Sequence, residues 1–383
     1  MFSLKFTDEQ ENIRKMVADF AAKELAPGAA ARDQSESFEE AYHIMMGKMT
    51  EIGLMGLPYP KEYGGAGSDT VSLALAAIEI SKVDAAMGCS YAVHIGLAGW
   101  PIFHYGNEAQ RQKYSIPLFK GEKLGAFGLT EPNAGSDSGC QETVAVLDGD
   151  EYVLNGKKCF ITNSGYADTY VVFAMTDKAK GAKGISTFIV EKDTPGFTFA
   201  KQERKMGIRA TVQRELVFEN CRIPKENLLG KEGDGFKIAM TTLDGGRITI
   251  ASQGVGIAMG AYEYALNYAK QRVQFNKPII QQQVISFKLA DMYTQIEAAR
   301  LLTLQAAWYK DAGLNYSVVA AMAKKFATNT AMYVTTEAVQ ILGGHGFLVD
   351  HPLERMMRDA KITQIYEGTN EIQNLVIGGA IMR

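Results

Sequence analysis

Residues 148–162 read Asp148-Gly-Asp-Glu-Tyr-Val-Leu-Asn-Gly-Lys-Lys-Cys-Phe-Ile-Thr162. The dipeptides Asp148-Gly149 and Asn155-Gly156 are typical of tight turns between antiparallel strands, because these residues accept the left-handed backbone that such turns need. The runs that follow them, Glu151-Tyr-Val-Leu and Cys159-Phe-Ile-Thr, have strand character. The stretch therefore predicts antiparallel strands joined by hairpins in the middle of the chain.

Further runs with strand character lie on both sides of this stretch, from about Gly121 to Pro224. Their apolar residues follow a period of two or form short continuous runs, which is typical of a compact sheet. These runs are Tyr170–Met175, Ile185–Val190, Phe197–Ala200 and Arg214–Phe218. Together they predict a central antiparallel β-barrel or sheet domain over residues 121–230.

Helical periodicity dominates outside this β domain. Thr7 followed by Gln10 forms a capping-box pattern, and Pro27-Gly28 is expected to end the first helix. Near the other end of the chain the expected helices are Ser317–Leu342, stopped by Gly343-Gly344, and Pro352–Ile365. We therefore expect a multi-domain α+β protein, with an N-terminal helical domain at residues 1–120 and a C-terminal helical bundle at 231–383.

Composition excludes several classes of protein. The 383 residues are 46% hydrophobic and 22% charged with a net charge of −3, so nothing favours a nucleic-acid partner. Four widely spaced cysteines, and no leader pattern in Met1–Gln10, favour a cytoplasmic protein. The uncharged stretch Ala85–Ile102 has the length of a membrane span, but its polar residues, glycines and proline favour a buried helix and its exit loop, so no membrane insertion is expected.

The sequence gives little support for a dinucleotide-binding, metal-binding or hydrolase motif. Gly254-Val-Gly-Ile-Ala-Met-Gly260 approximates a dinucleotide fingerprint, but it lies in a helical pattern without flanking strands, so close helix packing is the better interpretation. The five histidines and four cysteines have no metal-ligand spacing, and no metal is expected. No Gly-x-Ser-x-Gly elbow supports hydrolase chemistry.

Three polar segments with glycines are better candidates for a site. Phe127–Asp137 and Phe160–Gly165 each follow or end a strand, and each could turn backbone amides and threonine hydroxyls towards a planar heteroaromatic ring. Either segment alone could equally be an ordinary loop. The third, Arg358–Glu371, places Glu367 directly before Gly368 at a helix break, where a carboxylate can project into a cleft or lie in solvent.

The three segments together resemble the signatures of the acyl-CoA dehydrogenase family. Leu129-Thr-Glu-Pro-Asn-Ala-Gly-Ser-Asp137 is similar to its first signature, and Arg358–Gln373, with the core Tyr366-Glu-Gly-Thr369, is similar to its second. The resemblance covers essentially the whole chain and is strongest to bacterial short-chain, or butyryl-CoA, dehydrogenases. It implies a helical domain, a β-barrel and a four-helix bundle, with FAD as cofactor and a homotetramer built as a dimer of dimers.

Residue by residue, the resemblance assigns most of the matching positions to FAD. The positions matching FAD-binding residues are Phe127, Leu129, Thr130, Ser136, Phe160, Ile161, Thr162, Arg272, Phe275, Gln283, Gln340, Ile341, Gly343, Gly344, Thr369, Asn370 and Glu371. Thr162 is expected near the ring nitrogen that accepts hydride, and Phe160 stands where many relatives have tryptophan. The group from Arg272 to Gly344 is implied to bind the diphosphate and adenine across a subunit boundary.

The resemblance also implies the reaction and its substrate site. Glu367 matches the base that removes the α proton of an acyl-CoA while the β hydrogen leaves as hydride, giving the trans-2-enoyl-CoA, or the reverse. Some relatives carry this base at the position of Gly246, so only Glu367 is available here. Positions that match substrate contacts are Ser136, Asp244, Arg247, Tyr366 and Gly368. Cys89, Ser90, Val93 and Leu97 are expected to close the acyl pocket.

The usual electron partner of such enzymes is an electron-transferring flavoprotein, and we expect the same partner here. Two other interpretations stay open from the sequence. An acyl-CoA oxidase would pass electrons to O2, although oxidases are commonly much longer chains. A catalytically silent scaffold would keep the fold without the chemistry, although the Tyr366-Glu-Gly-Thr369 set is intact.

Overall fold

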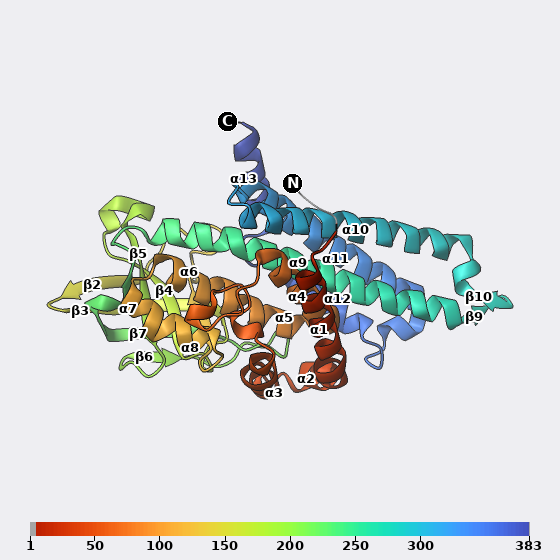
Figure 1. Cartoon of the computed structure of the whole chain (residues 1–383), viewed down its shortest axis with the longest axis horizontal. Coiled ribbons are helices and arrows are strands. Elements are labelled where there is room, and N and C mark those ends of the chain that lie inside the picture. The colour runs from red at the N-terminus through yellow and green to blue at the C-terminus, as the bar shows by residue number, and fades with distance from the viewer. Residues whose placement is uncertain (1–4, 383) are drawn as a thin grey trace.

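The computed structural model describes residues 5–382, and Figure 1 shows their arrangement. A helical N-terminal part and the β-sheet share one end of an elongated molecule, and long helices extend from them to the opposite end. The N-terminal helices are α1 (Asp8–Phe20), α2 (Ala29–Ser35), α3 (Glu39–Ile44), α4 (Thr70–Val83), α5 (Ala85–Ala92), α6 (Trp100–Tyr105), α7 (Glu108–Gln110) and α8 (Ile116–Phe119).

The first helix begins as the sequence predicts and then continues further than expected. The Gln10 amide donates to Thr7 Oγ1 at 3.2 Å, and the Thr7 amide donates to Gln10 Oε1 at 3.0 Å, which confirms the capping box. The expectation that Pro27-Gly28 ends the helix is wrong, because these residues form a 3-10 turn, η2 (Ala26–Gly28), that leads into α2. Proline fits here because its missing N–H would be unpaired in the first turn of a helix.

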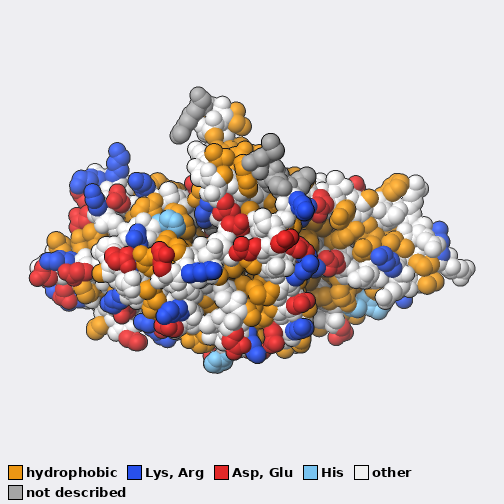
Figure 2. Space-filling view, viewed as in Figure 1, with side chains coloured by type: hydrophobic (Ala, Val, Ile, Leu, Met, Phe, Trp, Pro, Cys, Tyr) orange, Lys and Arg blue, Asp and Glu red, His pale blue; other side chains and the backbone are white. Residues whose placement is uncertain are grey.

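The uncharged stretch is a buried helical rod. It forms α5, a π-helical segment η6 (Val93–Gly99) and the start of α6, so the exit loop expected before Ile102 is instead helix as far as Tyr105. Within residues 5–382, no helix has an apolar stretch long enough to cross a bilayer. Acidic and basic side chains are interspersed over the face shown in Figure 2, as the small net charge suggests.

The central strands form one sheet in the order β6-β7-β3-β2-β4-β5-β8. The main strands are β2 (Val144–Asp148), β3 (Glu151–Thr162), β4 (Thr169–Met175), β5 (Ile185–Glu191), β6 (Phe197–Phe199), β7 (Gln213–Pro224) and β8 (Leu228–Leu229). Strand β1 (Gly125–Gly128) joins the sheet in parallel beside β4. The expected antiparallel arrangement therefore holds for most pairs, but β1 and β2 each pair with β4 in parallel. Among the described residues no pairing joins the end strands β6 and β8 into a closed ring.

Only one of the two expected hairpin turns exists. Asp148 pairs with Glu151, so Gly149 begins the tight turn between β2 and β3. Asn155-Gly156 does not form a turn, because it lies inside β3, where the register shifts by a bulge. Gly156 has φ +145°, and a Cβ there would lie 2.6 Å from the Thr143 Cα, so the glycine serves a bulge and a close backbone approach.

The C-terminal helices form a bundle around α9 (Gly235–Gln271), which packs against α4, α10 (Gln283–Asp311), α11 (Ser317–Leu342) and α12 (Leu353–Thr363). A short last helix, α13 (Asn370–Ile381), packs on α11. A Cβ at Gly254 would lie 3.0 Å from the Ala327 carbonyl oxygen on α11, and a Cβ at Gly256 would lie closer still to the Ile78 carbonyl oxygen on α4. This confirms that the glycine-rich segment allows close helix packing. At the far end of α9, a small hairpin, β9 (Val273–Gln274) and β10 (Lys277–Pro278), leads into α10 (Figure 1).

Candidate active site

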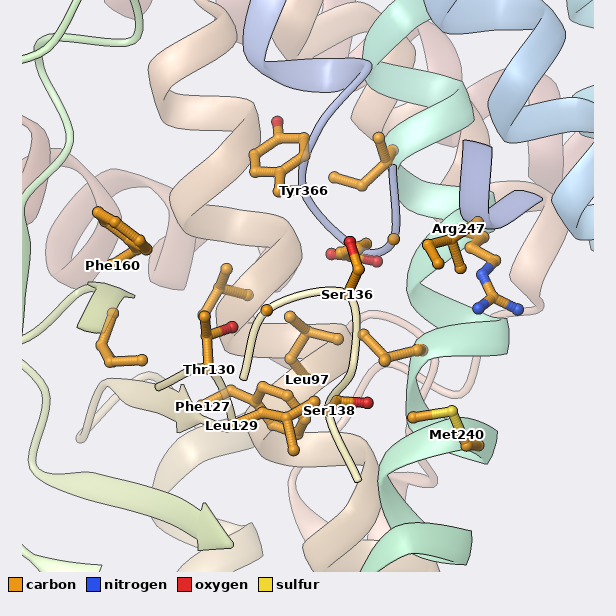
Figure 3. Close-up of a pocket in the computed structure, with 18 of the residues that line it drawn as sticks. Leu97, Phe127, Leu129, Thr130, Ser136, Ser138, Phe160, Met240, Arg247 and Tyr366 are labelled. Atoms are coloured by element: carbon orange, nitrogen blue, oxygen red, sulfur yellow. The ribbon is translucent and has the colours of Figure 1, made fainter. Parts of the chain in front are cut away.

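A cavity of about 400 Å³ lies where the N-terminal helices, the sheet and the C-terminal bundle meet. Domain junctions are preferred sites for ligands, because they supply concave apolar walls with a few polar groups. Its lining residues are Cys89, Val93, Leu97, Phe127, Leu129, Thr130, Gly135, Ser136, Asp137, Ser138, Gly139, Phe160, Ile161, Thr162, Ala182, Phe236, Met240, Leu243, Arg247, Ile250, Tyr366, Glu367, Gly368 and Ile372. In Figure 3, Thr130 and Ser136 from the sheet side face Arg247 and Met240 on α9 across this space.

The loop after β1 is anchored by a buried ion pair. Lys158 on β3 is fully buried, and its Nζ donates to Glu131 Oε1 at 2.6 Å and to Gln141 Oε1 at 3.1 Å. Burial lowers the pKa of Lys158 to about 8, while Glu131 beside it acts in the opposite direction. The Glu131 carboxylate also accepts the Thr143 amide at 3.1 Å, so the loop that carries Thr130 has a fixed position.

We expect Lys158→Met to destabilise the protein by about 3–5 kcal/mol, because the substitution leaves the buried Glu131 carboxylate without its charge partner. Urea or thermal unfolding of the FAD-loaded protein measures this effect. Lys157→Met, at the exposed neighbouring position, is the matched control and should change stability by less than about 0.5 kcal/mol. A second change, Glu131→Gln, should recover much of the loss in the Lys158→Met background.

A bulge in β3 turns Phe160 out of the sheet. The register with β7 shifts between Lys158 and Ile161, and Phe160 has φ +59° with 69% of its surface exposed beside the cavity. A bulge is the ordinary way for a strand to re-aim one side chain. Thr162 follows, and its hydroxyl oxygen accepts Gln213 Nε2 at 3.0 Å. The Thr162 hydroxyl keeps its own proton for donation, and the Cys89 thiol in the cavity wall is one acceptor within its reach.

Glu367 enters the same cavity from the turn between α12 and α13. Glu367 and Gly368 both have left-handed backbones, with φ of +53° and +89°. The side chain is half-buried, and its Oε2 atom is shielded from solvent without a hydrogen-bond partner in the described structure. Burial raises the pKa of Glu367 to about 8, although Lys324 and Arg247 act against this shift. A buried carboxyl group with a strongly raised pKa in a cleft is typical of a general acid or base.

One polar neighbour of Glu367, Arg247, comes from α9. Arg247 is buried, and its Nη1 atom donates to Asp244, whose carboxylate also accepts the Ser317 hydroxyl at 3.0 Å. Asp244 is therefore an anchor behind Arg247 and is not among the residues that line the cavity. Tyr366 lines the cavity, and its hydroxyl donates to Gln253 on α9.

The remaining residues that were expected to bind FAD fall into two groups by their place in the structure. Arg272, Phe275, Ile341, Gly343 and Gly344 line a second cavity of about 480 Å³ at the far end of α9, where Phe275 is 88% exposed. Gln283 and Gln340 flank this cavity in sequence without lining it. The first cavity is not lined by Thr369, Asn370 or Glu371. Thr369 caps α13, Asn370 is buried against α11, and Glu371 is exposed.

Sequence reasoning missed several residues around the first cavity. Phe236, Met240 and Leu243 form part of its wall from α9, and only their helical spacing could have indicated a shared face. Gly246 lies directly against the Glu367 carboxylate, and Lys324 lies beneath the turn. Ser90 was expected in the pocket wall but does not line it. Within residues 5–382, no group of histidines, cysteines and carboxylates is arranged to hold a metal ion.

Comparisons with known proteins agree with this architecture along the whole chain. The models of the N-terminal, middle and C-terminal domains of acyl-CoA dehydrogenases match residues 7–122, 126–221 and 233–382. The short-chain specific acyl-CoA dehydrogenase of Clostridium acetobutylicum is 55% identical over 377 residues, which are 98% of this chain and 99% of that protein.

Solved structures give the same result. Butyryl-CoA dehydrogenase from Megasphaera elsdenii is 50% identical with a TM-score of 0.97, and both chains are covered completely. A chain from the structural study of the electron transferring flavoprotein of Acidaminococcus fermentans is 52% identical with the same TM-score and complete coverage of both chains. The chain described here belongs to the acyl-CoA dehydrogenase family, whose members are FAD-dependent oxidoreductases acting on CH–CH bonds.

Proposed function

We propose that this protein is a short-chain acyl-CoA dehydrogenase that interconverts a C4 acyl-CoA and its trans-2-enoyl-CoA, with Glu367 as the group that moves the α proton. The observation that carries the proposal is the Glu367 carboxyl group, whose Oε2 atom is shielded from solvent and has no hydrogen-bond partner in the described structure, in a cavity lined by the two other polar segments. Relatives named for short-chain or butyryl substrates support the choice of chain length.

The lining of the first cavity fits the flavin ring of FAD. Phe160 offers an exposed aromatic face, and Thr162 keeps a hydroxyl proton that it can donate to a ring nitrogen. The loop at residues 135–139 adds two glycines, two serines and their backbone amides at the edge of the cavity. When bound, FAD supplies the two-electron acceptor for the β hydrogen. The chain's own residues bind and orient the ring, exclude water and handle the proton.

Glu367 must become a stronger base than a carboxylate in water, because an α C–H is a very weak acid. Burial does this by destabilising the charged form, which raises the pKa of Glu367 to about 8. In oxidation the carboxylate takes the α proton of the thioester, and in enoyl reduction the protonated acid returns it. The Glu367 backbone amide is expected to donate to the thioester oxygen and stabilise the enolate that forms.

Activity in the oxidative direction should rise with pH through about 8. The ionised carboxylate is the active form, so kcat/KM for butyryl-CoA should fall about tenfold for each pH unit below the Glu367 pKa. Enoyl reduction needs the protonated form and should decline above the same value. Steady-state assays of both directions from pH 6 to 9 measure the two limbs. A profile that is flat in both directions would contradict a base at Glu367.

C4 thioesters should be better substrates than C8 thioesters by at least about tenfold in kcat/KM. Cys89, Val93 and Leu97 are part of the cavity wall, as is Ile250, and we expect these apolar side chains to end the space for the acyl chain. Forcing extra methylene groups against a packed wall costs about 1–3 kcal/mol. This cost offsets the free energy gained by burying those groups. A series from C4 to C12 with saturated and enoyl thioesters tests specificity and direction together. A maximum at C8 or beyond would refute the short-chain assignment.

We further propose that one FAD molecule is held by two subunits of a homotetramer. The first and second cavities lie near Arg247 and Arg272, 25 residues apart on one helix, or about 37 Å at 1.5 Å per residue. One dinucleotide does not span that distance. A second copy of the chain could bring its own Arg272, Phe275 and Gly343 towards the first cavity, so FAD binding should depend on assembly.

An electron-transferring flavoprotein is the proposed electron partner, and a soluble cytoplasmic location is part of the same proposal. Similarity to a chain from the study of such a flavoprotein supports the partner. An acyl-CoA oxidase would instead reoxidise quickly in air. Mixing the yellow protein with butyryl-CoA should bleach it, and slow recovery in air with fast recovery on adding the partner flavoprotein would distinguish dehydrogenase from oxidase.

A further inference from the structure

The turn that carries Glu367 needs support from outside, because two consecutive residues have left-handed backbones. Glycine adopts this conformation readily, but glutamate does so only where surrounding groups hold it. The support comes from α11 and α13. Lys324 Nζ donates to the Gly368 carbonyl at 2.8 Å, and Gln373 Nε2 donates to the same carbonyl at 2.8 Å.

Lys324 is fully buried, and the rest of its contacts lock the same turn. Its Nζ also donates to Asn370 Oδ1 at 3.0 Å. Asn370 in turn donates to Thr328 Oγ1 at 3.0 Å and to Asn329 Oδ1 at 2.9 Å, so the first residue of α13 is tied to α11. Hydrogen bonds that involve Lys324, Thr328 and Asn329 of α11 therefore set the position of the turn that carries Glu367.

A neutral side chain could make these hydrogen bonds without the cost of burying an ammonium group. Gln373 already does so at the same carbonyl. Burial lowers the pKa of Lys324 to about 7, while the charge of Glu367 raises it. Lys324 in turn lowers the pKa of Glu367, and among the charged neighbours it has the largest effect. The charge of Lys324 is therefore coupled to the charge of the carboxylate, and the two groups titrate as a pair.

We propose that Lys324 is a positioning residue for the reaction: its hydrogen bonds to the Gly368 carbonyl and to Asn370 fix the left-handed turn that carries Glu367. This inference rests on the proposed role of Glu367. The other titratable or charged groups facing the pair are Arg247 on α9, Cys89 on α5, the neighbouring Tyr366, and Glu371 on α13, which acts on Lys324.

The test uses the FAD-loaded protein with Lys324→Met, Lys324→Gln and Lys324→Arg, and Lys325→Met as the matched control. In Lys324→Met, kcat for butyryl-CoA should fall by about 10²-fold with a smaller change in KM, because a displacement of about 1 Å at a reacting group can cost about this factor in rate. Hydrogen exchange of the amides at residues 366–371 should quicken at least about tenfold. Lys325→Met should leave both measurements at the wild-type values.

The other two variants separate charge from hydrogen bonding and remain informative if Lys324→Met fails to fold. Lys324→Gln keeps a hydrogen-bond donor without the charge and should recover much of kcat and of the exchange protection, whereas Lys324→Arg keeps the charge on a longer, planar group and should recover less of both. Wild-type kcat and exchange rates in Lys324→Met, or a Lys324→Gln variant that recovers no more than Lys324→Met, would overturn the inference. Wild-type activity in Glu367→Gln would instead overturn the proposed function itself, so the two failures are distinguishable.

Discussion

Replacing Glu367 by glutamine should lower kcat for butyryl-CoA by about 10²- to 10⁴-fold while FAD and acyl-CoA still bind. Glutamine has nearly the same shape as glutamate, so the cavity and the left-handed turn are expected to persist, but an amide cannot accept the α proton. General acid–base groups typically contribute this factor to rate, which corresponds to about 3–5 kcal/mol of activation free energy. Stopped-flow reduction of the flavin by butyryl-CoA measures the chemical step directly.

The control for this variant is Glu62→Gln, an exposed carboxylate on the N-terminal part that does not line the cavity. It should retain wild-type reduction rates. The absorbance of bound FAD and the change in its spectrum on adding a substrate analogue report binding separately from turnover. Near-normal flavin reduction in Glu367→Gln would refute the assignment of the base, whatever the other residues of the cavity do.

Gly246→Ala should lower kcat/KM by about 10²-fold without lowering stability. A Cβ at this position would overlap Glu367 Oε2 and would lie 2.9 Å from its Cδ and 3.0 Å from Leu97 Cδ2, so the carboxylate must move. A displacement of about 1 Å at a reacting group can cost about 10²-fold in rate. Position 246 is inside α9, where alanine is favoured over glycine by about 1 kcal/mol, which offsets strain in the fold.

Gly245→Ala is the matched control for Gly246→Ala. It makes the same substitution one residue earlier on the same helix, where the nearest atom to a new Cβ is the flexible end of Lys310 at 3.2 Å. Both variants gain helix propensity, but only Gly246→Ala meets the carboxylate. Assays of kcat/KM with butyryl-CoA and thermal unfolding of the two variants give the comparison. Equal activity in both would show that the room beside Gly246 does not position Glu367.

Hydrogen-bonded turns and bulges mark the limit of what local sequence patterns could predict. Asp148-Gly149 and Asn155-Gly156 look alike as dipeptides, yet the first belongs to a hairpin turn and the second to a bulge inside β3. The difference arises from β7, which pairs along the whole of β3 and keeps the strand extended. Pairing partners far away in sequence are invisible to a pattern of fifteen residues.

The sequence by itself determined the order of helical, β and helical parts, the capping box at Thr7 and the carboxylate before a glycine at position 367. These features depend on periodicity and on backbone preferences of single residues, which are local properties. The packing of distant helices is what shields the Oε2 atom of Glu367 from solvent, makes room for it beside Gly246 and places Lys324 beneath its turn. Burial and charge coupling arise from residues more than forty positions apart, so they exist only once α9, α11 and the turn have packed together.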